Sequence, residues 1–207
     1  MDGEQVWSGI VKHPFVVELY EGVLPDEKFR YYLLQDYAYL NGLIRSLCVI
    51  ASKSDRDLMR RVLSLAHSEV TIEMENYRRM LSQIDLSLAD AMSVEPAPTN
   101  VAYTNFLLSS AYSKSPLVGL AALLPCFWSY AEIAERHRGR LEHNGNQLYR
   151  QWASVYLADE TKDLVEEIRV LVDEVEDPGD AEKAFMIASR YEFMFWEMAY
   201  RLEGWSI

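Results

Sequence analysis

The chain has 207 residues and half of them are hydrophobic, so it can bury a sizeable core as one large domain or two small ones. Its 32 acidic residues outnumber its 20 basic residues, which gives a formal net charge of −12. This balance argues against a nucleic-acid surface, which needs clustered lysines and arginines, and against binding to an anionic membrane.

Nearly every long segment has the hydrophobic period of a helix, and none shows the sustained alternation of a strand. The first predicted helix opens at Pro25, where a proline suits the first turn and the acidic residues that follow complement the helix dipole. It ends near Ser52. A second helix follows Asp55 and continues through Met74 to about Leu81.

The rest of the chain alternates between helical segments and polar breaks. Residues 82–98 break the periodicity, and Thr99 is the expected N-cap of a helix that runs to about Tyr112. The remaining predicted elements are a helix from Ser115 to about Arg138, a loop over 138–146, helices over 147–157 and 159–175, a turn over 177–180, and a terminal helix that ends at Leu202.

No change in composition, internal repeat or low-complexity segment marks a domain boundary. We therefore predict an all-α fold, a single domain over residues 1–207 built as a helical bundle of about seven or eight helices. The first residues, Met1–Gln5, lack the apolar stretch of a secretory signal, and the longest apolar run, Leu117–Trp128, is too short to cross a bilayer. We expect a cytoplasmic protein with no membrane partner.

The terminal helix carries two glutamates with different expected environments. Glu192 shares a stripe with Phe195 and Trp196, so its carboxyl group should be buried among aromatic rings. Such burial is unfavourable unless the group is neutral or paired, and catalysis is one explanation for tolerating it. Glu197 lies on the side of Arg201, its i+4 partner, and should form a surface ion pair.

Asp36 is a second acid on an apolar stripe, between Tyr32 and Tyr39. For one isolated acid, the ordinary explanation is a buried aspartate that bonds a tyrosine hydroxyl or a backbone amide. Two such acids on two long helices favour a shared interior site, because both helices should turn these stripes toward the same core.

The two cysteines, Cys48 and Cys126, are too few and too far apart for a disulfide framework, although one bridge remains open. Cys126 shares its stripe with Gly119 and Ala122, which leaves room beside the thiol, and Pro125 removes a helical hydrogen bond next to it. A nucleophile is one interpretation of Cys126, and a small buried hydrophobic residue is the other. Cys48 is expected in the core.

Four tyrosines, Tyr39, Tyr103, Tyr130 and Tyr156, fall on or near apolar stripes. Their rings could stack on a flat heterocycle while their hydroxyls form hydrogen bonds, or they could simply fill the core. The sequence contains no Glu-x-x-His pair, which a di-iron bundle needs, and no other common metal motif. We expect no metal and no other cofactor.

Several segments together resemble the TenA (thiaminase II) family. They are HPFV at 13–16, LPDEKF at 24–29, YYLLQDYAYL at 31–40, LLPCFWSY at 123–130, and YEFMFW at 191–196 followed by EGW at 203–205. The resemblance covers nearly the whole chain in the same order and with similar spacing. The combination of Leu-Pro-Cys with Tyr-Glu-x-x-Phe-Trp is far more specific than any of these motifs alone.

This resemblance implies a haem-oxygenase-like all-α fold and a homotetramer. The family hydrolyses aminopyrimidines and releases 4-amino-5-hydroxymethyl-2-methylpyrimidine for thiamin salvage, and many members also cleave thiamin. It therefore implies a small-molecule pyrimidine substrate and no nucleic-acid partner. The alternatives are a non-catalytic pyrimidine-binding or regulatory protein on the same fold, and a haem or di-iron enzyme of related architecture.

The resemblance also assigns roles to residues at matching motif positions. Cys126 is the nucleophile, Glu192 the proton donor, and Tyr39 the residue that raises the reactivity of Cys126. Asp36, Tyr130 and Tyr156 contact the pyrimidine, while Tyr103 and Phe195 line the pocket. Tyr156 lies in the segment that matches the family pattern least well.

These roles fit the chemistry of a pyrimidine, which is a poor electrophile when neutral. A glutamic acid of raised pKa can protonate a ring nitrogen, and this makes a ring carbon open to attack by a thiolate. Asp36 is expected to hold the exocyclic amino group and a ring nitrogen together, as a carboxylate that accepts hydrogen bonds from this edge of the pyrimidine.

Overall fold

The computed structural model describes residues 3–176 and 178–206, which contain helices, turns and loops but no strand. The all-α prediction is thus confirmed. The elements are α1 (Gly3–Val11), α2 (Pro14–Glu21), α3 (Asp26–Lys53), α4 (Arg56–Ser68), a π-helical segment η1 (Glu69–Glu73), α5 (Met74–Ser82), α6 (Leu88–Ser93), α7 (Pro98–Ser113), α8 (Pro116–Leu141), α9 (Gln147–Ser154), a 3-10 turn η2 (Val155–Leu157), α10 (Asp159–Asp173) and α11 (Pro178–Arg201).

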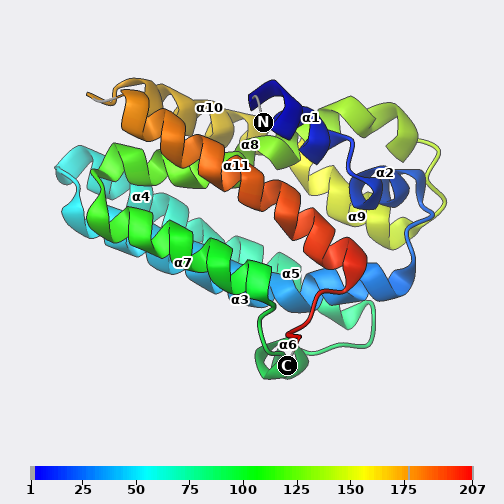
Figure 1. Cartoon of the computed structure of the whole chain (residues 1–207). Coiled ribbons are helices and arrows are strands. Elements are labelled where there is room, and N and C mark those ends of the chain that lie inside the picture. The colour runs from blue at the N-terminus through cyan, green and yellow to red at the C-terminus, as the bar shows by residue number, and fades with distance from the viewer. Residues whose placement is uncertain (1–2, 177, 207) are drawn as a thin grey trace.

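Four long helices, α3, α7, α8 and α11, form the centre of the molecule, and each contacts the other three. The continuous rod of α4, η1 and α5 packs along α3, and α10 packs along α8 (Figure 1). Helices α2 and α9 close one end of the bundle (Figure 1). The central core is therefore enclosed between two outer layers, and the residues that face inward from α3, α8 and α11 meet there.

Side-chain caps fix several of these helix boundaries. Asp55 accepts hydrogen bonds from two backbone amides at the start of α4, and Asn146 does the same for α9. Ser115 caps α8 in the same way. Gly22 ends α2 with φ of +79°, a left-handed conformation that suits glycine. The three N-caps fix where α4, α8 and α9 begin, and Gly22 fixes where α2 ends.

The seven helical segments predicted from periodicity are all present, and three short helices were not anticipated. Those are α1, α2 and α6, of six to nine residues each. The helix predicted over residues 55–81 exists, but it contains the π-helical segment η1. The loop predicted over 138–146 is shorter, because α8 continues to Leu141. Short helices carry too few periods for a stripe to be recognised.

Thr99 is not the N-cap of α7, contrary to the prediction. The helix begins at Pro98, and Thr99 instead donates hydrogen bonds from its backbone nitrogen and its hydroxyl to the two carboxylate oxygens of Glu203, at 3.0 and 3.1 Å. Trp205 donates from its indole to the carbonyl of Pro96 at 3.1 Å. The segment after α11 therefore secures the start of α7.

The turn predicted over residues 177–180 is also not as expected. Pro178 is the first residue of α11, so Pro178–Asp180 form the opening turn of this helix. Asp177, the first residue of that predicted turn, lies outside the described residues. A proline at the first position of a helix has the backbone angle that the helix needs.

Cys48 is exposed, so its placement in the core was wrong. The buried stripe of α3 passes through Leu43, Leu47 and Ile50. One residue beyond Leu47, the helix turns Cys48 outward, to the side of the exposed Arg45. Cys126, by contrast, is buried, and both thiols are free.

Helix α8 is the most apolar part of the fold. Among the described residues, α8 is the one helix that is long and apolar enough to span a membrane by length and composition. The uninterrupted apolar run within it, Leu117–Trp128, is by itself too short to cross a bilayer. However, 67% of the longer apolar window of α8 is buried inside the bundle. Burial of this kind is the ordinary property of a core helix, and it places Cys126 deep in the structure.

The two glutamates of α11 have different environments, as predicted. Glu192 is 2% exposed, whereas Glu197 pairs with Arg201, with an Oε2–Nε distance of 2.5 Å. Glu197 also lies 3.3 Å from Nε2 of the buried His13, a contact that the helical spacing did not reveal. Burial lowers the pKa of His13, so this contact joins a neutral imidazole to the carboxylate at neutral pH.

The packing of α3 on α7 gives a testable prediction for stability. A Cβ atom at Gly42 would lie 2.7 Å from Cγ2 of Thr104, so Gly42→Ala should force the two helices apart and destabilise the protein by about 1–3 kcal/mol. Gly139, on an exposed turn of α8, has no atom within 4 Å of such a Cβ. Gly139→Ala should therefore stabilise the protein by about 0.5–1 kcal/mol. Urea unfolding of both variants measures this, and equal effects would contradict the packing argument.

Candidate active site

The chain encloses a cavity of about 420 Å³ between α3, η1, α8, η2 and α10. This is within the usual range for a small-molecule site, about 300–1,000 Å³. Five of the eight residues predicted to form the site line this cavity, and they are Asp36, Tyr39, Cys126, Tyr130 and Tyr156. They come from three different elements, so the fold brings together side chains up to 120 positions apart in the sequence.

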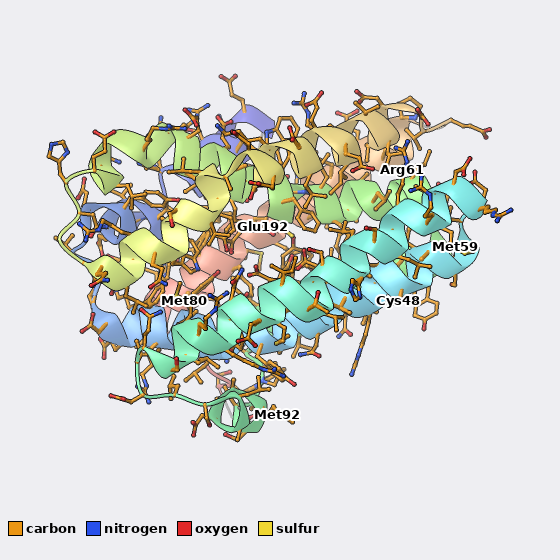
Figure 2. All side chains as sticks on the ribbon, turned by 180° about the vertical axis from the view of Figure 1, so that it is seen from behind. Cys48, Met59, Arg61, Met80, Met92 and Glu192 are labelled. Carbon is orange, nitrogen blue, oxygen red and sulfur yellow. The ribbon has the colours of Figure 1, made fainter. Side chains whose placement is uncertain are left out.

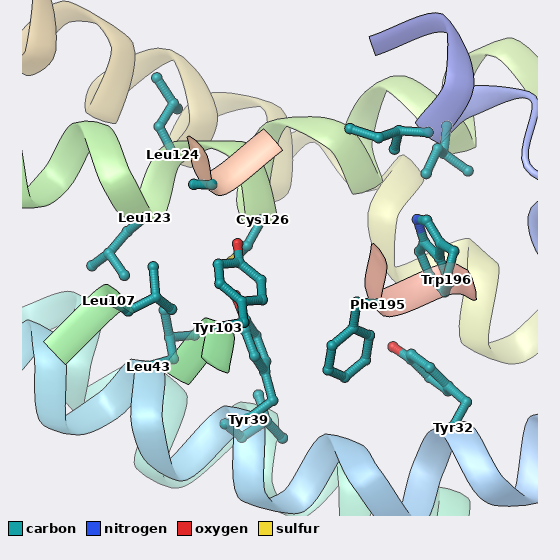
Figure 3. Packing of buried hydrophobic residues seen from close by; sticks show 14 of the residues in the cluster. Tyr32, Tyr39, Leu43, Tyr103, Leu107, Leu123, Leu124, Cys126, Phe195 and Trp196 are labelled. Atoms are coloured by element: carbon teal, nitrogen blue, oxygen red, sulfur yellow. The ribbon is translucent and has the colours of Figure 1, made fainter. Parts of the chain in front are cut away.

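Cys126 faces the cavity from the middle of α8, and Tyr39 reaches toward it from α3 (Figure 3). Burial raises the pKa of the Cys126 thiol well above its ordinary value, and the nearby Glu192 raises it further. Contact with Tyr39 acts in the opposite direction. The Tyr39 hydroxyl is buried, yet it has no partner of full hydrogen-bond geometry in the described part of the chain. The thiol is therefore protonated at neutral pH, and its attack on a substrate needs a base to remove the proton.

Glu192 lies near the middle of the bundle, on α11 (Figure 2). Tyr103 of α7 donates a hydrogen bond of 2.5 Å to its Oε1, and both side chains are buried. Burial raises the pKa of Glu192 to about 7, and the bond from Tyr103 restrains this rise. Glu192 is not among the residues that line the cavity, but its charge raises the pKa of Cys126 and of Asp36. A carboxyl group with this pKa can both donate and accept a proton near neutral pH.

Asp36 opens onto the cavity from α3 and is half-buried. Burial raises its pKa well above the ordinary value, and three other carboxylates, Glu73, Glu192 and Glu69, raise it further. No hydrogen bond to its carboxyl group is found among the described residues that would offset this. Both causes favour the protonated form of the Asp36 carboxyl group over the ionised form.

Aromatic side chains form one wall of the cavity. The rings of Tyr130 and Tyr156 lie 4.9 Å apart at an interplanar angle of 55°, and the hydroxyls of Tyr32 and Tyr130 are 3.2 Å apart. Such flat faces with hydroxyls at their edges suit a planar heterocycle.

Tyr103 and Phe195 do not line the cavity, contrary to the expectation. Their rings pack against the ring of Tyr39, at 5.2 and 5.3 Å between centroids (Figure 3). They come from α7 and α11, and Tyr39 lies between them and the open space. Both residues therefore support the cavity wall from behind.

Among the cavity residues that the sequence reasoning missed are Glu69, Glu73 and Asn76. They lie on η1 and the first turn of α5. A signal for them existed, because the apolar stripe that passes through Val62 and Ala66 continues onto Glu69 and Glu73 at helical spacing. The π-helical segment adds one residue to the turn and could not be predicted from that spacing.

Comparisons with known proteins show which proteins the chain is similar to. The TENA/THI-4/PQQC family model matches residues 2–202. An aminopyrimidine aminohydrolase from Halalkalibacterium halodurans is 33% identical over 210 residues, covering 98% of this chain and 94% of that protein. A solved structure of a TenA homologue from P. horikoshii OT3 is 48% identical, with a TM-score of 0.94 and coverage of 96% and 94%.

The fold is also shared with more distant structures. A domain of unknown function with a haem-oxygenase-like fold from Shewanella denitrificans matches with a TM-score of 0.74 at 13% identity, covering 96% of this chain and 87% of that one. The haem-oxygenase-like fold expected from the resemblance is therefore confirmed.

The bond between Tyr103 and Glu192 gives a testable prediction. Tyr103→Phe removes the hydroxyl that stabilises the ionised carboxylate, so the pKa of Glu192 should rise above its value of about 7. Tyr191→Phe is the control, because the Tyr191 ring stacks on Tyr103 at 5.2 Å from the next position of α11. Infrared titration of the buried carboxyl band measures the shift. An unchanged band in Tyr103→Phe, or an equal shift in the control, would contradict the assignment.

Proposed function

The chain belongs to the TENA/THI-4/PQQC family, and we propose that it is a hydrolase of aminopyrimidines that uses Cys126 as its nucleophile. The proposed reaction converts 4-amino-5-aminomethyl-2-methylpyrimidine to the corresponding hydroxymethylpyrimidine, and thiamin is a further substrate. The observation that carries the proposal is the meeting of Cys126, Tyr39 and Asp36 in one cavity, with Glu192 close enough to alter the pKa of both Cys126 and Asp36.

Recognition of the ring follows from the protonation of Asp36. A neutral aminopyrimidine presents an amino group that donates and an adjacent ring nitrogen that accepts. A protonated carboxyl group can accept from the first and donate to the second, forming two parallel hydrogen bonds. The raised pKa of Asp36 keeps its carboxyl group protonated, and the rings of Tyr130 and Tyr156 pack against the pyrimidine.

Activation requires one proton to move from the thiol to the ring. The Cys126 thiol has a raised pKa and must lose its proton to attack, while a second ring nitrogen must gain one. Glu192, with a pKa of about 7, can accept the first proton and donate it to the ring. Tyr39 stabilises the thiolate during this transfer, since its contact favours the ionised form.

The remaining steps restore the enzyme. The sulfur adds to a ring carbon. The electrons gained by the ring then expel the amine. The bond from the exocyclic methylene to nitrogen breaks, and its electron pair leaves with nitrogen. Water adds to the methylene carbon and loses a proton. The bond to sulfur then breaks, the ring nitrogen loses its proton, and Cys126 recovers a thiol. The net change is the exchange of an amine for a hydroxyl group.

A cytoplasmic location and a homotetrameric assembly are also part of the proposal, and the assembly rests on the resemblance alone. Size-exclusion chromatography with light scattering tests the assembly, because a tetramer has four times the 23.9 kDa mass of one chain.

The nucleophile can be tested by substitution. Cys126→Ala and Cys126→Ser should abolish release of hydroxymethylpyrimidine while leaving the far-UV circular dichroism unchanged. Cys48→Ala is the matched control and should retain full activity, since Cys48 is exposed on the outer side of α3. Glu192→Gln should lower kcat/KM by at least ~100-fold, because it cannot relay a proton. Full activity in a Cys126 variant would overturn the mechanism. Binding without turnover in the wild type would indicate a non-catalytic pyrimidine-binding protein.

The proton count predicts the sign of the pH dependence. The reacting form has a thiolate and a protonated Glu192, so the pair carries one proton. Below the Glu192 pKa of about 7 the pair carries two, and the second leaves only at the raised pKa of the thiol. We expect kcat/KM to rise about tenfold per pH unit below this pKa and to level off above it. The step should vanish in Glu192→Gln. A wild-type profile that falls through pH values around this pKa would contradict the relay.

A further inference from the structure

Three carboxylates that line the cavity, Glu69, Glu73 and Glu160, have no role in the reaction as described. Glu69 and Glu73 lie one turn apart on the π-helical segment η1, and both line the cavity. We propose that Glu69 and Glu73 bind a positively charged nitrogen on the exocyclic methylene of the substrate, and so select substrates with a cationic leaving group. This inference rests on the proposed function and names the substrate class of the same site.

The first argument is the absence of a basic partner. The residues that line the cavity in the described part of the chain include no lysine, arginine or histidine. Neither glutamate forms an ion pair within the described ranges, although ten ion pairs occur elsewhere in them. Asn76, which also lines the cavity, gives Glu73 a hydrogen bond but no charge. The pair is thus open to a cation from outside.

The second argument is the electrostatic cost of ionising two neighbouring carboxyl groups without a cation. Burial raises the pKa of Glu69 to about 8, and the neighbouring Glu73 adds to the rise. Burial likewise raises the pKa of Glu73. Two half-buried carboxylates in one turn repel each other when both are ionised, and a cation between them would remove this repulsion. The chain as a whole, with a net charge of −12, also attracts cations.

The Tyr39 hydroxyl is a further polar group that a bound substrate could contact. Tyr39, on α3, lines the same cavity and is only 7% exposed, yet its hydroxyl has no hydrogen-bond partner of full geometry among the described residues. A buried hydroxyl in this position is unfavourable, and such groups in native proteins need an explanation. A polar group of a substrate could form this bond beside the contact of Tyr39 with Cys126.

The placement of the pair fits the proposed position of the ring. The charge of Glu69 influences Cys126, and the charges of Glu73 and Glu69 influence Asp36. The pair is therefore near both the nucleophile and the group that holds the amino edge of the pyrimidine. The exocyclic methylene that reacts, and the nitrogen it carries, would lie within reach of the two carboxylates.

The test compares two ligands that share one ring. In the Cys126→Ser protein, which does not turn over, calorimetry gives the Kd of aminomethylpyrimidine, whose amine is protonated, and of hydroxymethylpyrimidine, which is neutral. Glu69→Gln and Glu73→Gln are then added separately, with circular dichroism to verify folding. Glu75→Gln is the matched control, because Glu75 lies on the next turn, outside the cavity, and pairs with Arg78.

We expect each cavity variant to bind the cationic ligand at least about tenfold more weakly, because a charged hydrogen bond is lost, and the neutral ligand within about twofold of its parent. The Glu75 control should change neither. Equal binding of the cation by all variants, or equal weakening of both ligands, would overturn the inference while wild-type hydrolysis leaves the proposed function standing. If neither pyrimidine binds and the wild type does not hydrolyse them, the proposed function falls and this inference falls with it.

Discussion

The structure depends on the burial of ionisable groups among aromatic rings in the centre of a helical bundle. Glu192 can remain there because Tyr103 donates a hydrogen bond of 2.5 Å to it, and because its pKa of about 7 lets it be neutral when no charge is needed. Four long helices must meet to make this environment. Tyr103 comes from α7, Glu192 from α11, Cys126 from α8 and Asp36 from α3.

The same environment decides which groups hold protons. In water, Asp36 would be ionised and Glu192 largely so at neutral pH, and neither could donate. In this site, burial raises the pKa of both carboxyl groups and of the Cys126 thiol, and neighbouring carboxylates raise the pKa of Asp36 and of the thiol further. The proposed reaction uses these groups in their protonated forms. Asp36 is the hydrogen-bond donor to the ring edge, and Glu192 is the proton relay for the nucleophile.

Much of this was accessible from the sequence, and the successes and failures have physical reasons. The burial of Glu192 followed from a regular stripe on a long helix, and the all-α fold followed from the same periodicity. Cys48 was misplaced because position on a helix face, and not the hydrophobicity of its neighbours, decides exposure. Tyr103 and Phe195, which pack behind the cavity wall, could not be distinguished from residues that line the cavity. Periodicity shows which face of a helix a residue is on, but not how far its side chain lies from the cavity. Glu69 and Glu73 lie at helical spacing on the buried stripe of α4, but acidic residues there were not recognised as cavity residues, and the π-helical segment itself could not be predicted from the spacing.

The most direct test of the account is a neutron structure, at neutral pH, of the protein with hydroxymethylpyrimidine bound. The account predicts the ring packed against Tyr130 and Tyr156, the Cys126 sulfur facing a ring carbon, and Asp36 donating one hydrogen to a ring nitrogen while accepting another from the amino group. It also predicts a hydrogen shared between Glu192 and the second ring nitrogen. A ring bound elsewhere, or bound in this cavity with the thiol turned away and with Asp36 and Glu192 both ionised, would contradict it.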